Sequence, residues 1–173
     1  TKYFEKAVGL KQLECKVIFI RGNREDQEAL SKLEKEHPEG LISVDNHETI
    51  YYLADGRGIS IQTGPESDIV FAGYGGISSV SRPKAYQRNS LVGFNESASD
   101  KLLDIKTDVL ITHQGTSKAR KGDETIDVLC GVIEPKIHIH GHSHSVEGPF
   151  KLGNTKSYGL SKFPNVKYQS KKG

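Results

Sequence analysis

The chain has 173 residues, a formal net charge of +2 and 35% hydrophobic residues. This length is enough for one domain with a buried core, and so small a net charge gives no argument for a nucleic-acid or membrane surface. No apolar run has the length of a transmembrane helix or a signal peptide, so we expect no membrane partner and a cytoplasmic protein. Cys15 and Cys130 lie in apolar contexts and are expected to be buried free thiols.

The first half of the chain shows strand and helix signals in alternation. Apolar and charged positions in residues 1–14 recur at roughly helical spacing, and the apolar run 15–20 predicts a buried strand. The acidic residues Glu25, Asp26 and Glu28 suit the start of a helix that ends before Pro38. Short strands are then expected over residues 41–44, 51–54, 59–62 and 69–72. The Asp55-Gly56-Arg57-Gly58 sequence predicts that the second and third of these form a hairpin.

The second half alternates helices with strands that end in polar residues. Residues 81–95 are irregular and basic, and a helix is expected over 96–103. A buried strand over 108–111, a helix over about 123–133, a strand over 136–140 and a closing hairpin from residue 146 complete the pattern. This mixed order favours a layered domain of the α/β or α+β class.

Polar side chains follow three of the apolar strands: Asn23, His113, and the pair His142 and His144. Ligand sites in open α/β sheets gather beyond the carboxyl ends of the strands, so these side chains are expected to meet. If the backbone stays extended, His140, His142 and His144 share one face, and Gly141 allows a bend. Because neutral imidazole is the commonest protein ligand for transition metals, the cluster is a candidate metal site.

Each residue also has a purely structural interpretation. Asn23 alone is most often a helix cap, His113 a strand-end residue, and His142 and His144 exposed loop residues. His138 and His140 are expected on the strand, one at the edge of the core and one supporting the site. Further candidates with a surface interpretation are His37, His47, Lys118, Arg120 and Lys121, although the last three could also steer an anionic substrate.

Gly22-Asn23, Thr112-His113 and Gly141-His142-Ser143-His144, in this order, resemble three of the five motif blocks of the calcineurin-like metallophosphoesterases. The resemblance covers about residues 15–160. It implies a two-sheet αββα sandwich, with residues 1–173 forming one domain. It also implies hydrolysis of phosphomonoesters or phosphodiesters by a water molecule that bridges two divalent metal ions (Mn, Fe, Zn or Ni).

The resemblance assigns roles to individual residues. Asn23, His113 and His142 are implied ligands of one metal, and His144 of the other. Arg21 is placed to bind the phosphate. Arg24 stands where the family has a histidine that assists the leaving group. Because arginine does not give up its proton at ordinary pH, substrates with good leaving groups, or diesters, are expected.

The family's Asp-x-His and Gly-Asp blocks are not found ahead of Val17. We therefore expect a chain that lacks the first strands of the domain, a fragment with impaired activity that holds at most one weakly bound metal. A non-catalytic interaction scaffold of the same fold is the alternative. A zinc amidohydrolase fits less well, because its His-x-His pair lies on the first barrel strand. The substrate class stays open, with nucleic acid possible only as a substrate, and so does the oligomeric state.

Overall fold

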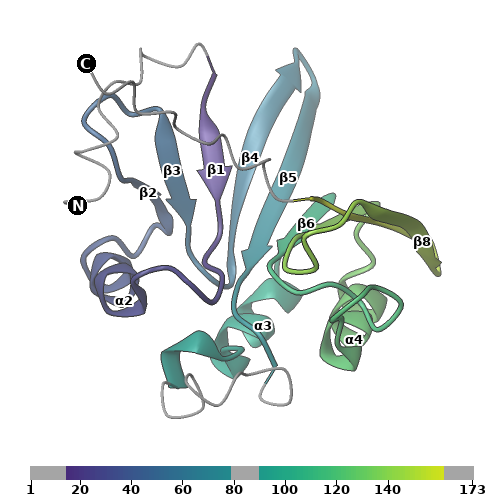
Figure 1. Ribbon diagram of the computed structural model, residues 1–173. Helices are drawn as coiled ribbons and strands as arrows, with labels where there is room; N and C mark the ends of the chain where they lie inside the picture. Colours follow the sequence, from purple (N-terminus) through teal and green to yellow (C-terminus); the bar gives the residue numbers. More distant parts are fainter. Residues whose placement is uncertain (1–14, 79–89, 162–173) are drawn as a thin grey trace, which may run out of the picture.

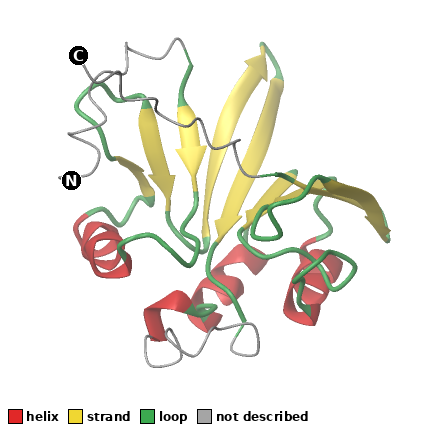
Figure 2. Ribbon diagram, in the orientation of Figure 1, coloured by secondary structure: helices red, strands yellow, loops and turns green. Residues whose placement is uncertain are grey.

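The computed structural model describes residues 15–78 and 90–161, and two β-sheets face each other in it (Figures 1 and 2). Within the described residues the smaller sheet has the order β1-β3-β2 and the larger sheet the order β4-β5-β6-β7-β9-β8. The smaller sheet comprises β1 (Val17–Phe19), β2 (Leu41–Ser43) and β3 (Ile50–Leu53). The larger comprises β4 (Arg57–Gly64), β5 (Ser67–Tyr74), β6 (Val109–Thr112), β7 (Ile137–His140), β8 (Glu147–Leu152) and β9 (Thr155–Gly159).

Parallel pairing brings the strand ends that matter for function to the same side of the molecule. β1 pairs in parallel with β3, and β5, β6, β7 and β9 pair in parallel with one another. The carboxyl ends of β1, β3 and β5 point toward the helical end of the molecule in Figure 1. This arrangement confirms the layered α/β class and the two-sheet architecture that the sequence predicted.

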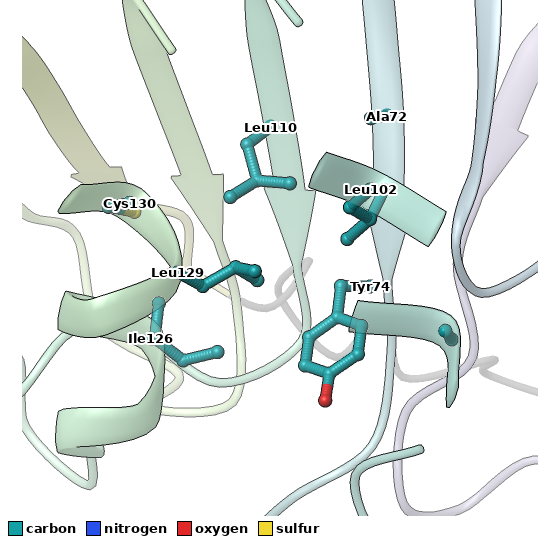
Figure 3. Packing of buried hydrophobic residues seen from close by; sticks show 8 residues of the cluster. Ala72, Tyr74, Leu102, Leu110, Ile126, Leu129 and Cys130 are labelled. Carbon is teal, nitrogen blue, oxygen red and sulfur yellow. The ribbon is translucent and has the colours of Figure 1, made fainter. Parts of the chain in front are cut away.

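The helices cover the sheets through apolar faces. α2 (Gln27–Glu36) begins at Asp26, whose carboxylate accepts the amide of Ala29, and it packs Leu30 onto Ile42 and Tyr52 of the smaller sheet. α3 (Glu96–Leu103) and α4 (Glu124–Ile133) pack together on one face of the larger sheet. Figure 3 shows this second core, which is formed by Ala72, Tyr74, Ala98, Leu102, Leu110, Ile126, Leu129 and Cys130.

The other face of the larger sheet approaches the smaller sheet at Gly73. A Cβ atom at this position would lie 3.0 Å from side-chain atoms of Ile20 and Leu53. Because a larger residue would force the layers apart, glycine sets how closely the two sheets approach each other. No described helix is long and apolar enough to span a membrane.

The predicted hairpin between residues 51–54 and 59–62 is wrong. β3 belongs to the smaller sheet, whereas β4 pairs with β5 in the larger one. Gly56 has a φ of +72°, and its turn carries the chain across from one sheet to the other. The hairpin is instead β4–β5, which the Gly64-to-Ser67 turn closes.

The other predicted elements are confirmed to within a few residues, and the closing hairpin is β8–β9. Residues 1–14 and 81–89 lie outside the described residues. Both cysteines are free, and burial raises the pKa of Cys130 to about 12. Cys15 is exposed, contrary to expectation, because it precedes a strand that pairs on one edge only within the described residues.

A buried ion pair joins the ends of β1 and β3 in the smaller sheet, and its carboxylate also binds the residue that follows β5 of the larger sheet. Arg21 and Asp55 are each 7% exposed, and Arg21 Nε donates to Asp55 Oδ2 at 2.5 Å. The second carboxylate oxygen of Asp55 accepts the amide of Gly75 at 2.7 Å. The Arg21 guanidinium also donates to the carbonyls of Leu91 and Gly93. The residues that follow all three strands are therefore held at one point.

We predict that Asp55→Ala lowers the free energy of unfolding by about 3–5 kcal/mol, because it leaves the Arg21 guanidinium buried without its counter-charge. Urea denaturation measures this loss. The matched control is Asp68→Ala on β5, where the exposed carboxylate accepts the Ser60 hydroxyl and makes no other described side-chain bond; its effect should stay within about 0.5 kcal/mol. Equal losses in the two variants would show that Asp55 does not hold the strand ends together.

Candidate metal centre

Three side chains from separate strand ends converge beyond the sheets. Asn23 follows β1, His113 follows β6 and His142 follows β7. His113 Nε2 lies 3.2 Å from Asn23 Oδ1 and 3.1 Å from His142 Nδ1. The two imidazole rings are tilted by 59° with their centroids 4.9 Å apart. The expected meeting of Asn23, His113 and His142 is therefore present in the structure.

The residues around Asn23 explain its position. A Cβ atom on Gly22 would lie 2.6 Å from Cε1 of His113, so only glycine lets the His113 ring lie against this backbone. Glu25 Oε2 accepts the amides of Gly22 at 2.8 Å and of Arg24 at 3.0 Å. These two bonds close the turn that presents Asn23 ahead of α2.

The histidine run does not continue as an extended strand. β7 ends at His140, and His142 and His144 both adopt the left-handed conformation with φ of 60° and 62°. The prediction that His140, His142 and His144 share one face is therefore wrong. His140 is 1% exposed and lies in the interior, whereas His142 turns toward His113.

The environment favours neutral imidazoles at the site. Burial, followed by the positive charge that His142, His144 and Arg21 can carry, lowers the pKa of His113 to about 4. Burial also lowers the pKa of His142, with further contributions from Lys121 and His144. Both rings thus keep a nitrogen lone pair available at neutral pH, which is the form that binds a metal.

The donor set fits a divalent cation. Ligand atoms bonded to one ion at about 2.0–2.2 Å lie about 2.8–3.6 Å from each other, between the octahedral and the tetrahedral angle. The separations of 3.1 and 3.2 Å fall in this range. One of the three donors is an amide oxygen. Accordingly, the described residues contain no cluster of three or more His, Cys, Asp or Glu side chains arranged for a metal.

The remaining candidate residues make no described hydrogen bond to these three side chains. His144 is exposed, and its charge reaches His113 without a hydrogen bond between the two rings among the described contacts. Arg24 is exposed and lines a hollow of about 660 Å³ beside α2. Arg21, which was expected to bind phosphate, is buried, and its guanidinium donates to Asp55 and to backbone carbonyls. His37 and His47 are exposed, as the surface interpretation predicted.

A chain of buried hydrogen bonds supports the segment that carries His113. The Thr112 hydroxyl donates to the Gln114 carbonyl at 2.5 Å, so Thr112 Oγ1 accepts from His138 Nε2 at 2.7 Å. His138 Nδ1 is then left to accept the Ser157 hydroxyl at 2.9 Å. This network joins β9, β7 and β6 and places a proton on His138 Nε2, while burial lowers the pKa of His138 and so favours its neutral form.

Sequence reasoning did not assign roles to Glu25, Ser157 or the glycine beside His113. Glu25 occupies the last place of the Gly-Asn block, and that position was the available signal. Nothing in the sequence marks Ser157, because it meets His138 only through the parallel register of β7 and β9.

Comparisons with known proteins identify the family of this chain. The family model of the calcineurin-like phosphoesterases matches residues 2–146, and the chain belongs to this family. Seven chains of solved structures match. One crystal structure aligns with a TM-score of 0.55 and 16% identity over 91% of this chain and 60% of the other, which shows the fold. The chain therefore spans about 60% of the length of that structure. No curated protein matches.

We predict a measurable pH dependence from His138. Burial, aided by the charge of His140, lowers its pKa from 6.5 to about 3. The folded state therefore favours neutral His138, and the stability this gives is complete above pH 6.5 and is lost as the pH falls toward 3. As the pH falls from 6.5 to 4.5, the free energy of unfolding should decrease less steeply in His138→Gln than in the wild type. The two slopes should differ by up to about 1.4 kcal/mol per pH unit.

Urea denaturation at several pH values measures the slope. His47→Gln is the control, because His47 is exposed and its replacement should leave the slope unchanged. A slope in His138→Gln equal to that of the wild type would contradict a neutral buried His138.

Proposed function

We propose that this chain carries the metal-binding face of a metal-dependent phosphoesterase, with Asn23, His113 and His142 as ligands of one divalent cation. The convergence of these donors at 3.1 and 3.2 Å carries the proposal. Family membership supports it, since calcineurin-like phosphoesterases generally bind divalent metals and hydrolyse phosphoesters.

The residues of the chain fit the handling of an anionic substrate. The ligands Asn23, His113 and His142 are neutral, so a bound cation would keep its full positive charge for phosphate oxygens. The cation would polarise the phosphoryl group and lower the pKa of a bound water. The positive charge of Lys121 lies close enough to lower the pKa of His142, and this charge attracts anions toward the same face.

His144 is our candidate ligand for a second metal, and Mn, Fe, Zn and Ni all suit imidazole. Because three donors meet at one point and no described hydrogen bond joins His144 to them, we propose that this chain by itself holds at most one metal, and holds it weakly. The free cysteines fit a reducing compartment, which supports a cytoplasmic location.

Removing one ligand tests the proposal. In isothermal titration with Mn²⁺, His113→Ala should weaken binding at least 10-fold, because the ring faces both other donors. Any hydrolysis of bis-p-nitrophenyl phosphate should fall in parallel and be abolished by EDTA. His47→Ala, which removes an exposed histidine, is the control and should bind as the wild type does. A wild-type chain that binds no divalent metal, or equal affinity in both variants, would refute the metal site.

Arg24 gives a second test, of substrate preference. Arginine stabilises negative charge but does not donate a proton to a leaving group at ordinary pH. We therefore expect Arg24→His to raise the turnover of p-nitrophenyl phosphate relative to its bis ester. Arg120→His, also at an exposed position, is the control. An unchanged ratio in Arg24→His would remove Arg24 from the reaction.

An interaction scaffold of the same fold is the second candidate, and a specific surface favours it. Leu103, Val128 and Val132 are 54%, 66% and 62% exposed and line a hollow of about 210 Å³ between α3 and α4. Apolar side chains gathered in this way mark interaction sites. The Mn²⁺ titration separates the two functions, since a scaffold requires no metal affinity.

A further inference from the structure

The loop that carries His142 has a strained backbone. His142 and His144 both have φ near +60°, which costs a non-glycine residue about 1–2 kcal/mol. Such conformations persist where the surrounding structure fixes them. Within the loop, the Ser143 amide donates to the Gly141 carbonyl at 2.7 Å, and the Gly141 amide donates to the His113 carbonyl at 3.2 Å. These bonds form only if both ends of the loop are held.

His140 holds the first end. Its side chain is 1% exposed and is enclosed by two glycines from other segments. A Cβ atom at Gly115 would lie 2.6 Å from the His140 ring, and one at Gly159 would lie 2.9 Å from it. The His140 carbonyl also accepts the amide of Leu160 at 2.7 Å.

Glu147 holds the second end. It begins β8 and pairs with Gly159 of β9. Its Oε2 accepts the amide of Arg120 at 2.8 Å, so it also fixes the loop that leads from His113 to α4. A Cβ atom at Gly159 would lie 3.0 Å from Glu147 Cβ and 3.3 Å from His140 Nε2, so both side chains lie against this one glycine.

The two anchors share an unusual property. His140 Nε2 and Glu147 Oε1 are buried and have no hydrogen-bond partner among the described residues, a property they share with Thr116 Oγ1. Buried polar atoms are normally paired, and an unpaired one costs about 1–3 kcal/mol. The two atoms belong to the two residues that flank the His142 loop, so both residues keep their places at a cost to stability, which is a feature of functional sites.

We infer that His140 and Glu147 are a positioning pair that clamps the ends of the 141–146 loop and so holds His142 Nδ1 against His113 Nε2. The role in metal binding rests on the proposed function, whereas the clamping of the loop does not. Glu147 acts through the loop and does not itself touch the metal ligands in any described contact.

Glu147→Ala tests the metal-binding part of the inference. We expect Co²⁺ affinity in the full chain to fall about 10- to 100-fold, with a changed visible absorption spectrum of the bound Co²⁺. Glu147→Gln keeps an acceptor for the Arg120 amide and should restore the affinity to within about 3-fold. Asp127→Ala is the matched control. Asp127 also accepts an amide of the 115–122 loop, from Ser117, but it lies on α4 and does not flank the His142 loop. Equal loss in Asp127→Ala would overturn the inference.

Amide hydrogen exchange tests the clamp without metal. Glu147→Ala should speed exchange of the Gly141 and Ser143 amides at least 10-fold, while the core amide of Leu110 stays protected. If Glu147→Ala does not fold, Glu147→Asp, which withdraws the carboxylate by one methylene, is measured with the same expectation. Unchanged exchange at Gly141 and Ser143 overturns the clamp. A wild type that binds no Co²⁺ refutes the proposed function alone, and the exchange rates then decide the clamp.

Discussion

The candidate centre depends on the contact between Arg21 and Asp55. Asn23 belongs to the smaller sheet, whereas His113 and His142 belong to the larger one, so the donors meet only while the sheets keep a fixed offset. Arg21 holds Asp55 within the smaller sheet, and the second carboxylate oxygen of Asp55 accepts the Gly75 amide that follows β5, so this bond fixes the offset of the two sheets near Asn23. The Arg21 guanidinium stabilises the fold in this way because its planar donors match a carboxylate and two carbonyls at once.

A second constraint acts from behind the centre. The hydrogen bonds that run from Ser157 through His138 to Thr112 place a proton on His138 Nε2, since the Thr112 proton is committed to the Gln114 carbonyl. Burial lowers the pKa of His138, so the interior holds it as a neutral imidazole. The network links β7 to the segment that carries His113, so His138 supports the fold, whereas His142, which follows β7, faces the centre.

The helices could be predicted because the signals that form a helix lie within a short stretch of sequence. α2, α3 and α4 have apolar spacing, acidic first turns and stop signals within their own sequence, and the structure reproduces them. The 55–58 turn failed as a hairpin signal because a glycine turn specifies a change of direction and not the partner strand. Asp55 binds Arg21 and Gly75, and these long-range bonds send the chain into the other sheet.

The types of side chain that follow the strands can be read from the chain alone, and with them the class of chemistry available: an amide and imidazoles suited to a divalent metal. Which of these side chains meet depends on how the two sheets pack. Asn23 and His113 are 90 residues apart, and the left-handed backbone at His142 removes it from the face that strand alternation assigns to it. The reason is that side-chain chemistry is local, whereas the separation of donor atoms depends on sheet packing and on long-range bonds that no short segment encodes.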